Sequence, residues 1–91
     1  MYLHIGNDYM INTKDLVGIF DIEKASTSQI TKDFLNKASK LDRIVYTTME
    51  MPKSFLVCFD SKNLSETIYI SQLACSTLKK RVKQAYDNYR L

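Results

Sequence analysis

The order of strand-like and helix-like segments is the feature that most restricts how this chain can fold. Short apolar or alternating segments at residues 2–5, 9–12, 16–22, 42–48, 54–60 and 67–71 predict strands. A period near 3.6 predicts helices over residues 26–41 and 76–89. This order, βββ-α-βββ-α, lacks the regular strand–helix alternation of a parallel sheet. We therefore expect an α+β fold with a mostly antiparallel sheet.

Turn and capping residues mark the ends of several segments. The Gly-Asn-Asp sequence at residues 6–8 has turn chemistry and predicts a hairpin between the first two strands. Pro52 marks the connection between the fourth and fifth strands. Ser26 and Gln29 have the spacing of a capping box, and Ser76 is expected to cap the last helix.

Each predicted helix has one apolar face, which is typical of a helix that packs one side against a sheet. In the first helix this face consists of Ile30, Phe34, Leu35, Ala38 and Leu41. In the last helix it consists of Leu78, Val82, Ala85, Tyr86 and Tyr89. The segment 16–22 is apolar enough for a strand that is covered on both faces.

The chain has the length of one small domain, which we expect to span residues 1–91. Its 91 residues are 45% hydrophobic and 25% charged, an ordinary globular composition. No run approaches the ~18 apolar residues of a membrane span. The first residues also lack the basic and then apolar pattern of a secretory signal. The sequence thus predicts a cytoplasmic protein with no membrane partner.

Few residues in the chain could support catalysis or hold a metal ion. His4 is the single histidine, and Cys58 and Cys75 are interpreted as buried small hydrophobic residues. Gly6 and Gly18 cannot form a phosphate-binding glycine loop. The acidic residues are scattered singly along the chain. We therefore expect no enzyme activity, no metal site, no cofactor and no small-molecule substrate.

Positive charge is concentrated in the last helix. Residues 1–75 carry eight Lys/Arg and nine Asp/Glu, whereas residues 76–91 carry five Lys/Arg and one Asp, a net charge of +4. If Ser76 caps the helix, Lys79 and Lys80 fall in its first turn, where cations oppose the helix dipole. Lys79 and Lys83 also repel each other at i,i+4 spacing. A solvated helix face and an anion-binding surface are both consistent with this pattern.

Three stretches of the sequence together resemble a known family. They are "MYLHIGNDYMINTKDLVGIFDIE" at residues 1–23, "PKSFLV" at residues 52–57 and "STLKKR" at residues 76–81. In this order and spacing they are similar to the RemA/RemB family of bacterial extracellular-matrix regulators, and more to its RemB branch. The resemblance covers about residues 1–82. The tail at residues 83–91 extends beyond it, either as extra helical turns or as an interface element.

The resemblance implies a small cytosolic protein that forms ring-like homo-oligomers and binds DNA upstream of biofilm-matrix genes. In RemA, arginines near the third strand and in the loop before the fifth strand contact DNA, and the matching regions here hold Lys14 and Lys53. The loop's arginine pair falls at about Met51 and Pro52. Lysine keeps the positive charge but lacks the bidentate fork that reads guanine.

These observations predict a homo-oligomeric regulator of transcription that holds double-stranded DNA mainly by its phosphate backbone. Many copies would add their contacts, because a few cations bind DNA weakly at physiological salt. The residues expected to contact DNA are Lys14, Lys53, Lys79, Lys80, Arg81 and Lys83. The alternative is a protein-interaction or scaffold module that acts on the same regulation without binding DNA.

Overall fold

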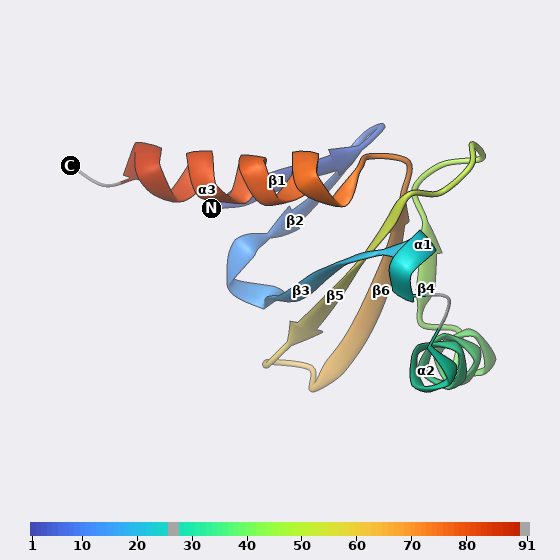
Figure 1. Cartoon of the computed structure of the whole chain (residues 1–91). Coiled ribbons are helices and arrows are strands. Elements are labelled where there is room, and N and C mark those ends of the chain that lie inside the picture. The colour runs from blue at the N-terminus through green and yellow to red at the C-terminus, as the bar shows by residue number, and fades with distance from the viewer. Residues whose placement is uncertain (26–27, 90–91) are drawn as a thin grey trace.

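The computed structural model describes residues 1–25 and 28–89 of the chain (Figure 1). Its elements follow the predicted order, with short helices added before and after the third strand. They are β1 (Tyr2–Gly6), β2 (Tyr9–Asn12), the 3-10 helix η1 (Thr13–Asp15), β3 (Leu16–Asp21), α1 (Ile22–Ala25), α2 (Gln29–Lys40), β4 (Ile44–Tyr46), β5 (Ser54–Asp60), β6 (Ser65–Ser71) and α3 (Cys75–Tyr89).

The strands form two separate sheets. One is the predicted hairpin of β1 and β2, which turns at Asn7, where φ is 48°. The other has four strands in the order β3-β5-β6-β4. In this sheet β5 pairs antiparallel with both neighbours, whereas β4 runs parallel to β6. The expected α+β fold with a mostly antiparallel sheet is therefore confirmed.

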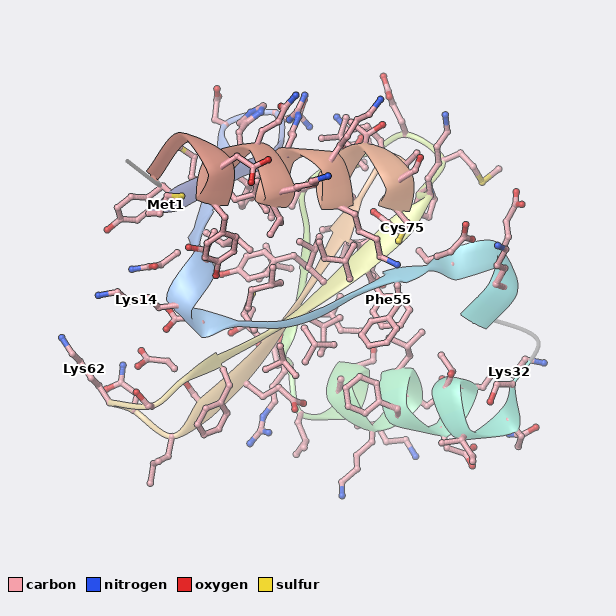
Figure 2. The ribbon with its side chains drawn as sticks, turned by 60° about the vertical axis from the view of Figure 1, so that its left-hand side comes forward. Met1, Lys14, Lys32, Phe55, Lys62 and Cys75 are labelled. Carbon is pink, nitrogen blue, oxygen red and sulfur yellow. The ribbon has the colours of Figure 1, made fainter. Side chains whose placement is uncertain are left out.

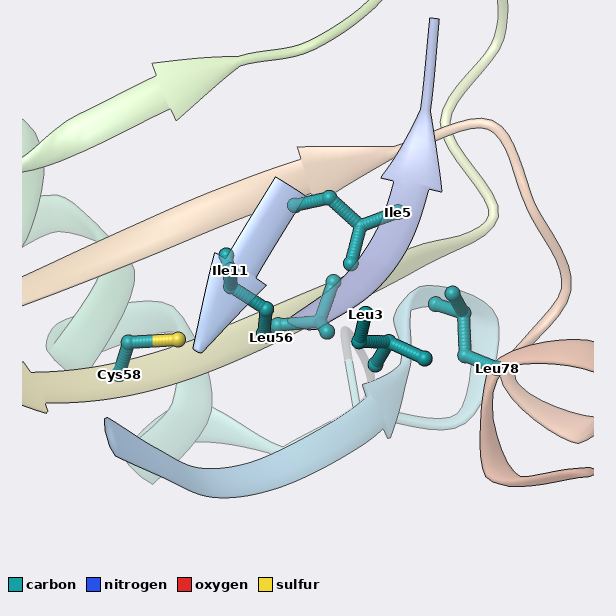
Figure 3. Close-up of a cluster of buried hydrophobic side chains, with 6 residues drawn as sticks. All are labelled: Leu3, Ile5, Ile11, Leu56, Cys58 and Leu78. Atoms are coloured by element: carbon teal, nitrogen blue, oxygen red, sulfur yellow. The ribbon is translucent and has the colours of Figure 1, made fainter. Parts of the chain in front are cut away.

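One face of the four-stranded sheet is covered by the β1–β2 ribbon and by α3, while α2 lies on the other side (Figure 2). The first core contains Leu3, Ile5, Ile11, Leu56, Cys58 and Leu78, which converge from the ribbon, β5 and α3 (Figure 3). The ribbon is also bonded to the sheet, because Ser71 Oγ donates to the backbone oxygen of Ile5 at 2.6 Å. The ribbon and α3 therefore form one layer on the sheet.

The second core lies between α2 and the sheet. Phe34, Leu35 and Ala38 pack there, as predicted. Ile30 and Leu41 were expected on the same face but are 82% and 51% exposed. The packed residues occupy little more than one helical turn, so the contact with the sheet does not extend to either end of the apolar face.

The prediction that the third strand is covered on both faces was wrong. Because β3 is an edge strand of its sheet, Val17 is 68% exposed and Phe20 is 43% exposed. Phe20 instead stacks on Phe55, with ring centroids 5.0 Å apart. The strand also ends at Asp21, and Ile22 begins α1.

The cap predictions also need correction. Ser28 occupies the N-cap position of α2 and makes no side-chain cap bond, while Ser26 lies outside the described residues. Ser76 does not precede α3 but lies within it, because the helix already begins at Cys75. Within the described ranges, none of the helices combines the length and the hydropathy needed to cross a bilayer.

Candidate nucleic-acid interface

Two of the predicted contact residues, Lys53 and Lys79, lie on the same hollow. Its volume is about 830 Å³, and its wall is formed by the end of β3, α1, Thr31 of α2, the start of α3 and the residues before β5. The wall also carries the carboxylates of Asp21 and Glu23. The backbone of Lys53 is fixed, because its N–H donates to the oxygen of Ser71 at 2.9 Å and its oxygen accepts from Ile22 at 3.1 Å. Both lysine side chains are exposed. The fold thus brings together cations that are 26 positions apart in the sequence.

Lys14 lies elsewhere. It belongs to η1, before the first residue of β3, whereas the hollow lies beyond the last residue of that strand. Figure 2 shows Lys14 and Cys75 toward opposite ends of β3. Six residues of strand span roughly 20 Å at about 3.3 Å each. The neighbours of Lys14 in a second hollow include Asp15, Asp60 and Lys62, so its local charge is mixed.

Arg81 is bonded within the chain. Its Nη1 donates to the backbone oxygen of His4 at 3.1 Å and lies 3.3 Å from His4 Nδ1. The side chain of Arg81 is half-buried, whereas Lys79, Lys80 and Lys83 are exposed. Among the predicted cations of α3, the three lysines are therefore the ones that face solvent.

The position of the α3 start changes the expected electrostatics of this helix. Leu78 N–H bonds to the oxygen of Ala74, so Lys79 and Lys80 lie beyond the first turn. The expected unfavourable interaction with the helix dipole is correspondingly weaker, because it falls off within the first turn. The first turn carries no acidic residue. Repulsion between Lys79 and Lys83, roughly 0.2–0.5 kcal/mol, remains.

A hydrogen-bond chain that was not predicted joins α3 to the connection between β4 and β5 (residues 47–53). His4 Nε2 bonds to the oxygen of Asn7, which leaves Nδ1 as the acceptor facing Arg81. Asn7 Nδ2 donates to the oxygen of Thr47. Thr47 in turn donates to the oxygen of Ile70 from N–H at 3.0 Å and from Oγ1 at 2.8 Å. No local sequence pattern indicates this chain of contacts.

The connection at residues 47–53 also exposes two large apolar side chains. Met49 is fully exposed and Met51 is 82% exposed. This exposure could have been predicted from the sequence "MEMPKS", because proline marks a turn or loop and the two methionines lie next to it. Of this segment, only the lysine was predicted to have a functional role.

The thiols of Cys58 and Cys75 contribute little reactive chemistry to the basic surface at the start of α3. Burial, with a smaller effect of the Asp15 carboxylate, raises the pKa of the Cys58 thiol to about 11. Cys58 is a buried small hydrophobic residue, as predicted, whereas Cys75 is half-buried beside the hollow. Cys75 Sγ contacts the oxygen of Ile19 at 3.7 Å. Across residues 1–25 and 28–89, no three His, Cys, Asp or Glu side chains come together to hold a metal ion.

Comparison with known proteins agrees with the resemblance found in the sequence. A family model described as RemA-like, "Extracellular matrix regulatory protein A-like", matches residues 2–82. The chain is also 39% identical over 87 residues to "Extracellular matrix regulatory protein B" of Bacillus subtilis (strain 168). That alignment covers 96% of each of the two chains.

Proposed function

This chain belongs to the RemA/RemB family, closer to RemB, and from that membership we propose that it regulates extracellular-matrix genes as a homo-oligomeric, double-stranded-DNA-binding protein of the cytoplasm. The observation that carries the proposal is the basic surface at the start of α3. There Lys79, Lys80 and Lys83 are exposed, and Lys53 approaches Lys79 from another segment.

The proposed binding mode is contact with the phosphate backbone. Lysine presents a compact charge without the planar fork that arginine offers to guanine. Arg81, the one described arginine of α3, is bonded to His4. We assign the direct contacts to Lys80 and Lys83, while Lys53 and Lys79 add positive potential at the rim of the hollow. Lys14 is too far along β3 to join the same patch within one copy.

Self-association is the second part of the proposal. Two to four cations per copy bind duplex DNA weakly at physiological salt, because each contact adds only a modest electrostatic contribution. Copies arranged in a ring multiply the contacts without new chemistry. A duplex that follows such a rim must bend, which costs roughly 1–6 kcal/mol for a short site. Sequence preference then comes partly from how easily the DNA deforms.

A salt titration of DNA binding tests the proposal. Fluorescence anisotropy would follow the protein on a duplex from upstream of a matrix gene, between about 50 and 200 mM salt. Lys80→Gln and Lys83→Gln should each weaken binding and reduce the salt slope by about 1 per lost phosphate contact. Lys62→Gln, in the turn between β5 and β6, is the matched control and should leave both unchanged. Affinity that does not depend on salt would overturn the proposal.

The second candidate function is a scaffold that acts through a protein partner. The observation in its favour is that Met51 and Pro52 occupy the positions where the resemblance places an arginine pair. An assembled protein that binds no duplex even at low salt, yet changes matrix-gene expression when deleted, would favour this candidate.

A further inference from the structure

The exposed methionines of the connection between β4 and β5 are held in place by bonds on both sides. Before them, Thr47 is bonded twice to Ile70, and after them Lys53 N–H is bonded to Ser71. Between these anchors, Glu50 N–H donates to Thr48 Oγ1 at 2.9 Å. We call residues 49–51 the tip. Figure 1 shows the connection reaching past the end of the sheet. The fold therefore holds two apolar side chains in water at a fixed place.

The tip has an alternating apolar and acidic character. Glu50 is exposed between Met49 and Met51, and it makes no ion pair in the part of the chain that the structure describes. Methionine is unbranched and flexible, so it can fill irregular apolar space. A surface that accepts the tip needs apolar walls and at least one cation at its rim.

The hollow beside α3 has both properties. Ile19, Phe20, Ala74 and Cys75 supply apolar wall. The charged residues of the lining are Lys24, Lys53 and Lys79 and, with the opposite sign, Asp21 and Glu23, which leaves a net charge of +1. Its volume of about 830 Å³ has room for two methionine side chains. None of the three tip residues lines this hollow in its own chain. The tip, with the single carboxylate of Glu50, and the hollow, with apolar wall and one net positive charge, are thus complementary but do not meet within one copy.

We propose that the tip of one copy inserts into the hollow of a second copy, with Met49 and Met51 on the apolar wall and Glu50 beside Lys53 and Lys79. This contact deepens the proposed function, since it rests on the proposed self-association and names the surface that makes it. Lys53 and Lys79 then lie at the boundary between copies, and the direct DNA contacts remain on Lys80 and Lys83.

The native thiol in the hollow allows a direct test by disulfide trapping. In Met51→Cys protein, mild oxidation should produce a covalent dimer and larger covalent multimers on a non-reducing gel, because the introduced thiol of each copy would lie near Cys75 of the next copy. The dimer should disappear when Cys75→Ser is added. Leu64→Cys is the matched control, because Leu64 is 77% exposed in the turn between β5 and β6, and it should not cross-link. A Met51→Cys dimer that survives Cys75→Ser, or equal trapping through Leu64→Cys, would overturn the proposal.

A second measurement uses no cysteine. The double variant Met49→Ser/Met51→Ser should raise the concentration at which the assembly dissociates by at least about tenfold, as measured by light scattering after gel filtration. Leu64→Ser should leave it unchanged, and circular dichroism should show that both variants fold. An unchanged assembly in the double variant contradicts the proposal. If the disulfide forms but the protein binds no DNA, the DNA-binding function is rejected and the contact between tip and hollow is retained. If the protein binds DNA but no disulfide forms, the contact is rejected and the DNA-binding function is retained.

Discussion

The guanidinium of Arg81 donates from Nη1 to the backbone oxygen of His4 at 3.1 Å and faces Nδ1 of the same residue at 3.3 Å. This contact joins the middle of α3 to the centre of β1. Arg81 thus helps to orient α3, the helix that also carries the exposed side chains of Lys79, Lys80 and Lys83. Its charge contributes to the surface, but its hydrogen bonds are used inside the chain.

The first prediction follows from this contact. Arg81→Lys should lower the free energy of unfolding by about 1 kcal/mol, because a lysine cannot bond to both acceptors of His4 with the same geometry. Urea denaturation measures the change. Lys80→Gln, one residue away and exposed, should stay within about 0.5 kcal/mol of the wild type. Equal effects of the two substitutions would show that the contact to His4 contributes nothing.

The attachment of α3 should depend most on Leu78. This side chain is fully buried between the ribbon and β5. Leu78→Ala should therefore lower the free energy of unfolding by about 2–5 kcal/mol, the range for buried leucine truncations. Ile30→Ala, which truncates an exposed residue of α2, should change it by less than about 0.5 kcal/mol. A Leu78→Ala protein of wild-type stability would contradict the described core.

Gly6 should tolerate substitution less well than Gly18. Its φ of 131° is strained for any residue with a Cβ, and an added Cβ would lie 2.7 Å from Gln72 Oε1. At Gly18 an added Cβ would lie 2.8 Å from the ring of Phe20, but the backbone there does not have a positive φ, and the ring is partly exposed and can shift. Thermal denaturation should show a larger drop in Tm for Gly6→Ala than for Gly18→Ala. The opposite ranking would refute this account of the β1–β2 turn.

The turn between β5 and β6 should make stability depend on pH in the acid range. The backbone N–H of Lys62 lowers the pKa of the Asp60 carboxyl, with further help from the backbone and side chain of Asn63. A lowered folded-state pKa adds stability above the unfolded value, about 3.9, and this stability is lost as pH falls through the folded value. The Tm difference between wild type and Asp60→Asn should shrink from about pH 5 to about pH 2. A difference that stays constant would exclude this role for the charge.

The two thiols should differ in reactivity. With its pKa raised to about 11, Cys58 has almost no thiolate at pH 8, and its side chain is buried. Iodoacetamide should therefore leave Cys58 unlabelled in the native protein and label it only after unfolding in urea, whereas Cys75 should react once the protein is diluted to single copies. Peptide mass mapping distinguishes the two sites. Comparable labelling of Cys58 in the native state would contradict its burial.

Much of the fold was predictable because its signals are local. The strand and helix periodicities of the apolar residues locate the six strands and the two long helices. The turn at residues 6–8 and Pro52 mark two of the connections between them. Periodicity failed at Ile30, since it indicates the face of a helix but not how far the opposing sheet extends. It also placed the start of α3 one residue late, because the bond from Leu78 to Ala74 brings Cys75 into the helix.

The candidate site was less predictable because it depends on contacts between distant segments. Composition identified the lysines of α3, but it gave no indication that Lys53 would lie on the same hollow as Lys79. It also gave no sign that Arg81 would bond to His4, 77 positions away. Pairing of this kind is decided by how the ribbon, the sheet and α3 pack together, which no short stretch of residues encodes.

The parallel pairing of β4 with β6 has a consequence for the order in which the protein folds. The partner strand of β4 comes later in the chain, after β5 and its turn. During synthesis from the N-terminus, Ile44–Tyr46 therefore emerges well before the residues that will complete its ladder. The helix α2 packs against Ile68 and Ile70 of that same late strand. The core between α2 and the sheet can therefore form only after β6 has been synthesised.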